Sequence, residues 1–264
     1  MTALAWDQVG SRKFSVGLDR GVLYPSDGPA VPWNGLVSID EKSGKEISSH
    51  YVDGQKYLDH VSLGDYTATL NAFTYPDEFE EINGAKDLGN GLLLQDQPLK
   101  PFGLSYRTRV GNDLDGSDAS YRIHLLYNLV AIGDSVGYNT LDESTPLTTF
   151  SWELSGTPIA IVGARPTAHL VIDTAKVSED ALPDLEAILY GTDATDPQLP
   201  SFSNLLYILN SGETMTVVDN GDGTWTVTAT DGSITMLDST TFQITNANAI
   251  YLDADTYQIS STDL

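Results

Sequence analysis

Apolar and polar side chains alternate with a period of two residues over much of the chain, and this period predicts β-strands. The alternation is clear over residues 148–155, where Phe150, Trp152 and Leu154 fall on one face. Similar segments occupy residues 14–24, 31–40, 46–75, 102–110, 119–132 and 169–173. From Met215 onward, apolar segments predict a β-meander with strands near Trp225, Ile234, Phe242, Ile250 and Tyr257. The expected fold class is therefore all-β dominated, of the β-sandwich or barrel type.

One segment near residues 179–190 breaks this period and predicts an α-helix. Its apolar residues recur at the spacing that forms one helical stripe, at Leu182, Leu185, Ile188 and Leu189. Ser178 can cap the first amides, Pro183 suits the first regular position, and Gly191 can end the helix. A second helix is expected at 202–210. The first helix needs an apolar surface to cover, and in this chain a β-sheet must supply it.

The length of 264 residues allows one large β domain with a small appendage. We assign residues 1–211 to a sandwich domain with an N-terminal arm (1–13) and a long loop (76–101). Residues 212–264 are assigned to a C-terminal β-meander extension that packs on the same domain. The arm carries Trp6, which either packs on its own domain or reaches a neighbouring subunit. A loop as long as 76–101 is usually functional or disordered.

Two predicted strands, at 65–71 and 149–155, carry a polar face opposite their apolar face. The polar positions are Asp65, Thr67, Thr69, Asn71, Thr149, Ser151 and Glu153. A sheet with such faces is wetted on one side only. This is usually an ordinary solvent face, and it would also suit the wall of a water-filled channel.

Charge narrows the classes of partner. Thirteen basic and 37 acidic side chains give a formal net charge of −24, which disfavours tight binding to nucleic acid or anionic lipid. The chain has no cysteine, which excludes disulfides, thiolate chemistry and zinc–thiolate sites. The N-terminal segment lacks a long apolar run, and no run approaches the roughly 20 apolar residues of a membrane span. We therefore expect a soluble protein, without a membrane partner, that stays in the cell that makes it.

Candidate metal sites are weak in the sequence. The four histidines, His50, His60, His124 and His169, show no ligand spacing. The acidic residues Asp77, Glu78, Glu80 and Glu81 are close together, yet adjacent acids without ligand spacing are more typical of a solvated surface. Residues 111–118 and 219–224 resemble fragments of calcium loops but lack the required ligand order, so they are interpreted as turns. We expect no metal and no cofactor.

Catalytic motifs are also missing. Nucleophile motifs and glycine loops that cradle phosphate do not occur, and with so many carboxylates a pair at glycosidase distance would arise by chance. Trp152 and Trp225 could form a sugar-stacking platform, but their alternation favours core positions. We therefore expect no catalytic residue and no enzyme.

Several phrases resemble the major tail protein, or tail tube protein, of long non-contractile-tailed bacteriophages, particularly those of actinobacteria. They are AVPWNGLVS at 30–38, VSLGDYTATLNAFTYPDEF at 61–79, FGLSYRTRVGNDL at 102–114, RPTAHLVID at 165–173, DLEAILYGT at 184–192 and YLDADTYQIS at 251–260. The resemblance extends from near the N-terminus to near the C-terminus, and none of these phrases is a catalytic motif.

The resemblance implies a virion structural protein with a β-sandwich and a flanking helix. Such proteins form six-fold rings that stack into a tail tube, with a lumen through which DNA passes without specific binding. It implies self-association as the main partnership, with tape-measure, tail-tip and terminator proteins as further partners, and assembly in the host cytoplasm. The polar positions at 65–71 and 149–155 would then face the lumen. Trp6, Asp77, Glu78, Glu80 and Glu81 would lie at contacts between subunits.

Two other functions remain open at this point. A distal tail or baseplate ring protein of the same virion would form single rings and stop. A carbohydrate-binding β-sandwich is the alternative from another class, and the lack of a signal segment disfavours it.

Overall fold

A computed structural model describes residues 4–42, 44–62, 64–134, 136–138, 140, 147–161 and 164–210, together with six short C-terminal strands. Strands make up 47% of it and helices 14%, which confirms the strand-dominated fold class. The chain divides into two compact units, one comprising Met1–Ala175 with Asp193–Leu199 and the other Lys176–Thr192 with Pro200–Leu264. Among the described residues, no helix is long and apolar enough to cross a membrane.

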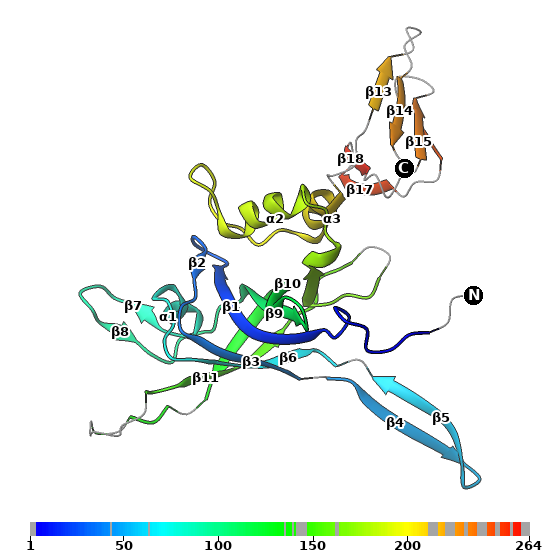
Figure 1. Ribbon diagram of the computed structural model, residues 1–264. Helices are drawn as coiled ribbons and strands as arrows, with labels where there is room; N and C mark the ends of the chain where they lie inside the picture. Colours follow the sequence, from blue (N-terminus) through cyan, green and yellow to red (C-terminus); the bar gives the residue numbers. More distant parts are fainter. Residues whose placement is uncertain are drawn as a thin grey trace. The chain divides into compact units, whose positions relative to one another are not determined.

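The first unit is built on an eight-stranded antiparallel sheet with the order β2-β1-β9-β10-β11-β6-β3, in which β12 also pairs with β10. These strands are β1 (Phe14–Pro25), β2 (Val31–Pro32), β3 (Leu36–Lys42), β6 (Tyr66–Ala72), β9 (Phe102–Asn112), β10 (Gly116–Gly133), β11 (Phe150–Gly156) and β12 (His169–Asp173). Two hairpins lie outside the sheet, formed by β4 (Glu46–Val52) with β5 (Gln55–Ser62) and by β7 (Lys86–Asp87) with β8 (Leu93–Leu94). Figure 1 shows β9 and β10 on one side of this unit, with β3, β6 and β11 on the other.

The core of the first unit lies between these two parts of the sheet. Leu104 on β9 and Leu126 on β10 share one apolar cluster with Leu70 on β6 and Leu154 on β11. Leu23 on β1 belongs to the same cluster, and Ile39 on β3 packs against it. Strands from both ends of the sheet therefore contribute to one core, around which the sheet curls. The predicted inward positions of β11 are confirmed at Trp152 and Leu154, which are buried.

The expected loop at 76–101 contains ordered elements, namely α1 (Glu78–Ile82) and the β7–β8 hairpin. Two apolar residues of this short helix, Phe79 and Ile82, are buried. The Phe79 ring lies 4.6 Å from Trp33 and 5.1 Å from Trp152, centroid to centroid. The 76–101 segment is ordered at α1 because Phe79 contributes an aromatic ring to the core. The sequence did not predict this helix, because five residues are too few to show a helical period.

Strand β10 departs from the strict alternation that its sequence suggests. The sequence pattern places Leu129 on the face of Leu125, opposite Leu126, yet Leu126 and Leu129 belong to the same core cluster. Asn128 has φ 48°, and the pairing with β9 shifts register between Leu126 and Leu129. A bulged residue at Asn128 therefore reverses the faces of the following residues.

The turn at 111–118 forms as expected for an Asx-rich connection. The Asn112 side chain accepts hydrogen bonds from the amides of Leu114 and Asp115. It also donates to the Asp115 carboxylate. These bonds hold the β9–β10 turn.

The second unit contains α2 (Ala181–Tyr190) and α3 (Phe202–Asn210), which contact each other. Both predicted helices are thus confirmed. The sequence predicted that a β-sheet would supply the apolar surface for α2, whereas the structure shows that α3 also contacts it. Helix α2 begins at Ala181 rather than Pro183, with Ser178 Oγ accepting a hydrogen bond from the Ala181 amide. Pro183 is tolerated because the amides of the first turn have no partner within the helix. Gly191, with φ 77°, follows the last helical residue as predicted.

The C-terminal strands of this unit confirm the predicted meander. A four-stranded antiparallel sheet consists of β13 (Thr216–Asp219), β14 (Trp225–Ala229), β15 (Gly232–Met236) and β16 (Phe242–Thr245). A hairpin of β17 (Ala249–Asp253) and β18 (Thr256–Ile259) follows. Residues 220–224 of the turn expected at 219–224 and the Trp225 side chain lie outside the described residues. The packing of 212–264 on the same domain as 1–211 stays a prediction. A short 3₁₀ turn, η1 (Thr174–Lys176), precedes α2 in the chain.

Candidate functional site

The structure brings the two predicted polar strand faces together on one surface. In the pairing of β6 with β11, Asn71 lies opposite Ser151 and Thr69 opposite Glu153. Strand β3 adds Asp40 opposite Thr69, on the other side of β6. We call this surface, formed by the outward side chains of β3, β6 and β11, the polar face. Its members are Ser38, Asp40, Lys42, Thr67, Thr69, Asn71, Ser151, Glu153 and Ser155.

Hydrogen bonds link side chains across the polar face. The Asn71 amide donates to Ser38 Oγ at 3.0 Å, and Ser38 Oγ donates to Asp40 at 3.0 Å. Lys42 Nζ lies 2.9 Å from Glu153 Oε1, which joins the two outer strands over β6. Of the other predicted lumen residues, Asp65 and Thr149 are exposed positions directly before β6 and β11.

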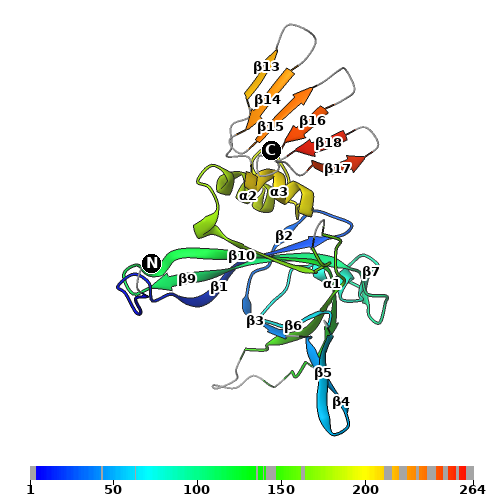
Figure 2. The same ribbon diagram turned by 90° about the vertical axis from the view of Figure 1, so that its right-hand side faces the viewer.

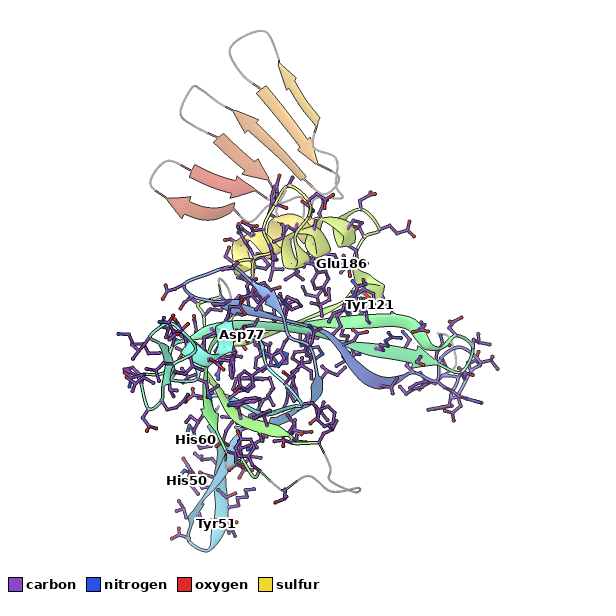
Figure 3. The ribbon with its side chains drawn as sticks, turned by 90° about the vertical axis from the view of Figure 1, so that its left-hand side faces the viewer. His50, Tyr51, His60, Asp77, Tyr121 and Glu186 are labelled. Carbon is purple, nitrogen blue, oxygen red and sulfur yellow. The ribbon has the colours of Figure 1, made fainter. Side chains whose placement is uncertain are left out.

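A second surface is the β4–β5 hairpin, which extends away from the sheet in both views of the ribbon (Figures 1 and 2). Three of its large apolar side chains are largely exposed, namely Ile47 (68%), Tyr51 (65%) and Tyr57 (72%). Figure 3 shows Tyr51 near the tip of the hairpin. An isolated two-stranded hairpin with exposed apolar side chains gains little from its own fold, so a partner surface is the usual reason to keep one.

Two features of the sequence locate this hairpin. Asp53 and Gly54 have φ values of 51° and 75°, as a two-residue hairpin turn of type I′ requires. At its base, Gly44 and Gly64 approach so closely that a Cβ on Gly64 would overlap the Gly44 backbone. The sequence pattern indicated one long pair of strands over 46–75. The structure instead has this hairpin followed by β6, and the Asp-Gly dipeptide is the signal that marks the turn.

The N-terminal arm contacts its own unit through polar groups. The Gly10 amide donates to Asp113 Oδ1 at 2.9 Å, and Arg12 lies 4.0 Å from the same carboxylate. Trp6 was expected either to pack on its own domain or to reach a neighbouring subunit. Its side chain is 77% exposed, so it does not pack on its own domain, and the contact with a neighbouring subunit stays a prediction. Leu4 and Val9 beside it are exposed as well.

The acidic residues of the 76–101 segment lie at the start of α1. Asp77, Glu78 and Glu81 are exposed, and Glu80 is half-buried. Lys100 lies 3.0 Å from Glu81, and this ion pair raises the pKa of the lysine. Figure 3 places Asp77 at the surface of the first unit. These acids therefore form a solvated surface with one ion pair, and their role between subunits stays a prediction.

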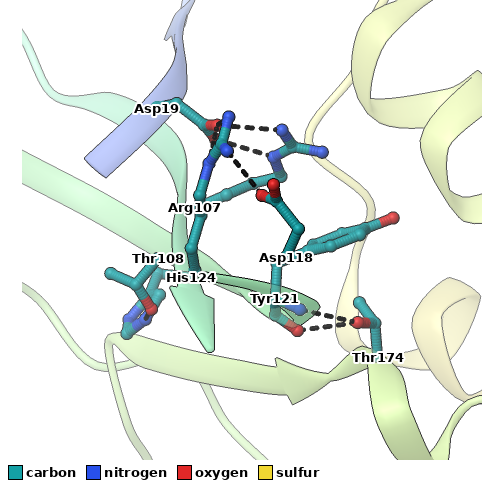
Figure 4. Close-up of polar contacts among 8 residues, drawn as sticks. Asp19, Arg107, Thr108, Asp118, Tyr121, His124 and Thr174 are labelled. Carbon is teal, nitrogen blue, oxygen red and sulfur yellow. Dashed lines mark hydrogen bonds and ion pairs between the residues drawn. The ribbon is translucent and has the colours of Figure 1, made fainter. Parts of the chain in front are cut away.

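An ion-pair network joins β1 to β9 (Figure 4). Arg107 makes two hydrogen bonds to the Asp19 carboxylate, at 2.8 and 3.0 Å, and Arg109 makes a third at 3.1 Å. The bond from Arg107 is the main cause that lowers the pKa of Asp19. Arg107 also lies over the Tyr121 ring, 4.5 Å from its centroid. In the same view, Thr174 Oγ1 donates to the carbonyl of Tyr121, at 2.7 Å.

A second cluster lies where the core opens to the surface, between β3, β10 and β12. His124 Nδ1 lies 3.0 Å from His169 Nε2. Glu41 Oε1 lies 3.5 Å from the first nitrogen and 3.6 Å from the second. Tyr106 donates a hydrogen bond to the same carboxylate oxygen, and its ring stacks on His124. We call Glu41, His124 and His169 the carboxylate–histidine cluster.

Burial and charge shift the titration of this cluster. Interaction with His124 is the largest cause that lowers the pKa of Glu41, to about 2. Burial lowers the pKa of His169, so this ring is neutral near pH 7. Burial is also the main cause that raises the pKa of Tyr106 and of Tyr66, so both hydroxyls stay protonated.

The sequence alone does not reveal the carboxylate–histidine cluster, because its members lie far apart in the chain. Glu41 precedes His124 by 83 residues, and His124 precedes His169 by 45 residues. Only the pairing of β10 with β12 sets His169 beside the strand that carries His124. No local motif could have signalled this arrangement.

Comparison with known proteins gives only distant similarities. No family model matches the sequence, and no curated protein matches it. Among solved structures, the chain is similar to one in the sheath–tube complex of an extracellular contractile injection system, with 12% identity and a TM-score of 0.31 over 58% of this chain and 88% of that one. It is also similar to a chain in the tube-terminating cap of the anti-feeding prophage, with 10% identity and a TM-score of 0.32 over 66% and 96% of the two chains. A chain in the baseplate of the same particle gives 10% identity and a TM-score of 0.29 over 65% and 97%. Similarities at this level do not define a family for the chain.

Proposed function

We propose that this protein is a structural virion protein that assembles into six-fold rings stacked as a phage tail tube. The observation that carries the proposal is the exposure of large apolar side chains on two extended segments, the β4–β5 hairpin and the N-terminal arm. Exposed apolar patches on projecting segments are typical of surfaces that bind a partner. Burial of Ile47, Tyr57 and Trp6 against neighbouring copies would remove this apolar surface from water.

The polar face is the proposed wall of the lumen. Hydroxyl, amide and carboxylate groups cover it, and the only cation in the described parts of β3, β6 and β11 is Lys42, which is paired with Glu153. Such a wall offers DNA no free positive charge to bind, and the net charge of −24 repels the phosphate backbone. DNA could pass along it without specific contacts.

The edge of the sheet supports an arrangement in rings. Strand β3 is the last strand in the sheet order, and the hairpin follows it directly in the chain. An open strand edge can pair with a neighbouring copy, and such pairing would remove the exposed edge of the monomer. Repetition around a ring would join the polar faces of the copies into a closed wall.

Contacts between rings are assigned to the arm (1–13), the 76–101 segment and the C-terminal end, with Trp6, Asp77, Glu78, Glu80 and Glu81 at these contacts. Tape-measure, tail-tip and terminator proteins are the proposed partners beyond the ring. The proposed location is the virion tail, with assembly in the host cytoplasm.

The test is negative-stain electron microscopy of the purified protein over a concentration series, with tail-tip complex added if no assembly occurs. We expect stacked rings with a central hole, and expect the variant Ile47→Ser/Tyr57→Ser to assemble only at concentrations at least tenfold higher. The matched control Ile47→Val/Tyr57→Phe keeps the apolar surface and should assemble like the parent. A protein that stays monomeric even with tail-tip complex would refute the proposal.

The same experiment separates the second candidate, a distal tail or baseplate ring protein, which would give isolated rings that never stack. A carbohydrate-binding module is less well supported, because Trp152, one of two candidate stacking residues, is 3% exposed within the core. Glycan binding by monomeric protein would favour that function instead.

A further inference from the structure

We propose that the carboxylate–histidine cluster of Glu41, His124 and His169 is a metal site that takes a divalent transition ion of the zinc type. The three side chains come from β3, β10 and β12, and each offers one ligand atom within 4.8 Å of the other two. Two imidazole nitrogens and one carboxylate oxygen form a donor set that zinc accepts in proteins.

The distances fit such an ion. Zinc bonds to nitrogen and oxygen are about 2.0–2.2 Å long, so neighbouring ligand atoms of a tetrahedral site lie roughly 3.3–3.5 Å apart. The three atoms of the cluster are separated by 3.0, 3.5 and 3.6 Å. The two imidazole nitrogens share a hydrogen bond in this structure, so a bound ion would replace its proton, and the nitrogens would separate by a few tenths of an ångström.

Neighbouring residues orient the ligands. His124 Nε2 lies 3.0 Å from Thr108 Oγ1, so a proton on that nitrogen leaves a lone pair on Nδ1, which faces the cluster. Tyr106 donates to the Glu41 carboxylate and stacks on the His124 ring at 4.5 Å between centroids. Partners of this kind fix the tautomer and the direction of metal-binding side chains.

One buried hydroxyl in this region lacks a close hydrogen bond. Tyr66 Oη is sealed from solvent and makes no hydrogen bond within 3.5 Å to the described residues, and its polar neighbour is the Tyr106 hydroxyl, which donates to Glu41. The Tyr66 ring lies 5.0 Å from the ring of His169. A buried hydroxyl without a partner is costly, and a site that holds an ion with its water offers such a hydroxyl a partner.

The burial of the three side chains and the access of solvent to them also suit a metal site. The side chains of His124 and His169 are 12% and 15% exposed, whereas that of Glu41 is 37% exposed. Glu41 and His124 line an open groove together with Tyr106 and Thr108, and this groove gives a path for an ion. The site is thus different from the solvated acids at Asp77–Glu81.

A bound ion would tie three strands together. Strand β3 ends the sheet order, while β10 lies in its middle, so the ion would link the edge strand directly to the centre. In a chain without cysteine, this is a cross-link that no disulfide can supply. The effect is on stability, and it is independent of whether the protein forms a tube.

The first experiment is calorimetric titration of chelator-treated full-length protein with zinc chloride in excess Mg²⁺, which suppresses weak binding to the many surface acids. We expect one ion per chain. The variants His124→Gln, His169→Gln and Glu41→Gln should each lower the affinity at least tenfold. The matched control His50→Gln/His60→Gln removes the other two histidines, on the exposed hairpin, and should bind like the parent.

Two further readouts keep the test decisive if a histidine variant fails to fold. Glu41→Gln changes the most exposed ligand, and Thr108→Val keeps all three ligands while it removes the group that orients His124. Cobalt(II) should give the visible absorption of a tetrahedral site in the parent and a weaker one in both variants. Zinc at about 100 times its Kd should raise the melting temperature by roughly 5–10 °C. Absence of stoichiometric binding, or binding that only the hairpin histidine variant abolishes, would overturn the proposal.

Discussion

At the scale of single residues, Asp19 forms a two-point ion pair with Arg107. It accepts two hydrogen bonds from Arg107, whose side chain is 12% exposed, and one from Arg109. A bidentate pair that is partly buried is stronger than an exposed one, and removal of its carboxylate leaves a poorly solvated charge behind. We therefore expect Asp19→Asn to lower the free energy of unfolding by about 1–3 kcal/mol near neutral pH.

The pH dependence of this loss follows from the pKa of Asp19. Because the pKa is lower in the folded protein, the carboxylate stabilises the fold above its unfolded pKa of about 3.9 and loses that effect as the pH falls through the folded pKa. Urea unfolding of parent and variant should thus differ near neutral pH and converge in acid. The control Asp118→Asn removes a 75% exposed partner of Arg109 and should cost under about 1 kcal/mol. An equal loss in both variants would contradict the argument.

At the scale of elements, the bulge in β10 decides which side chains enter the core. Asn128 is exposed and has φ 48°, a conformation that a β-branched residue adopts only at a cost of about 1–2 kcal/mol. Asn128→Val should therefore lower the free energy of unfolding by about that amount, whereas Asn128→Gly should be close to neutral. Chemical denaturation measures both. If Val were tolerated as well as Gly, the bulge would not depend on this residue.

Local patterns predicted the elements that are stabilised locally. The alternation of β11, the apolar stripe and glycine stop of α2, and the strands of the C-terminal meander all appear where their sequences placed them. The bulge at Asn128 escaped this reasoning because one residue with positive φ reverses every following side chain without a change in composition. Helix α1 escaped it because its stability comes from Phe79 in a distant aromatic cluster.

The candidate sites also differ in whether local sequence patterns or long-range strand pairing determine them. The polar positions of β6 and β11 were predicted separately from their alternation, and strand pairing then brought them onto one face. The carboxylate–histidine cluster depends wholly on pairing between strands far apart in the chain, which no spacing rule detects. The exposed hairpin had a local signal in Asp53-Gly54, but its lack of a covering surface is a property of the whole unit.

At the scale of the whole molecule, the proposed position of the polar face in the lumen of a tail tube can be tested by chemical labelling. The chain has no cysteine, so a single introduced thiol is the only reactive one. Thr149 precedes β11 at an exposed position, and Thr149→Cys should react with both a small maleimide and a maleimide on a bulky polymer in the unassembled subunit. In assembled tubes the bulky reagent should be excluded if the thiol faces the lumen, while the small one still reacts through the open ends. Dispersal of the tubes should restore the bulky reaction. Equal reaction of both reagents in intact tubes would place Thr149 on the outer wall, and loss of both reactions would place it in a contact between subunits.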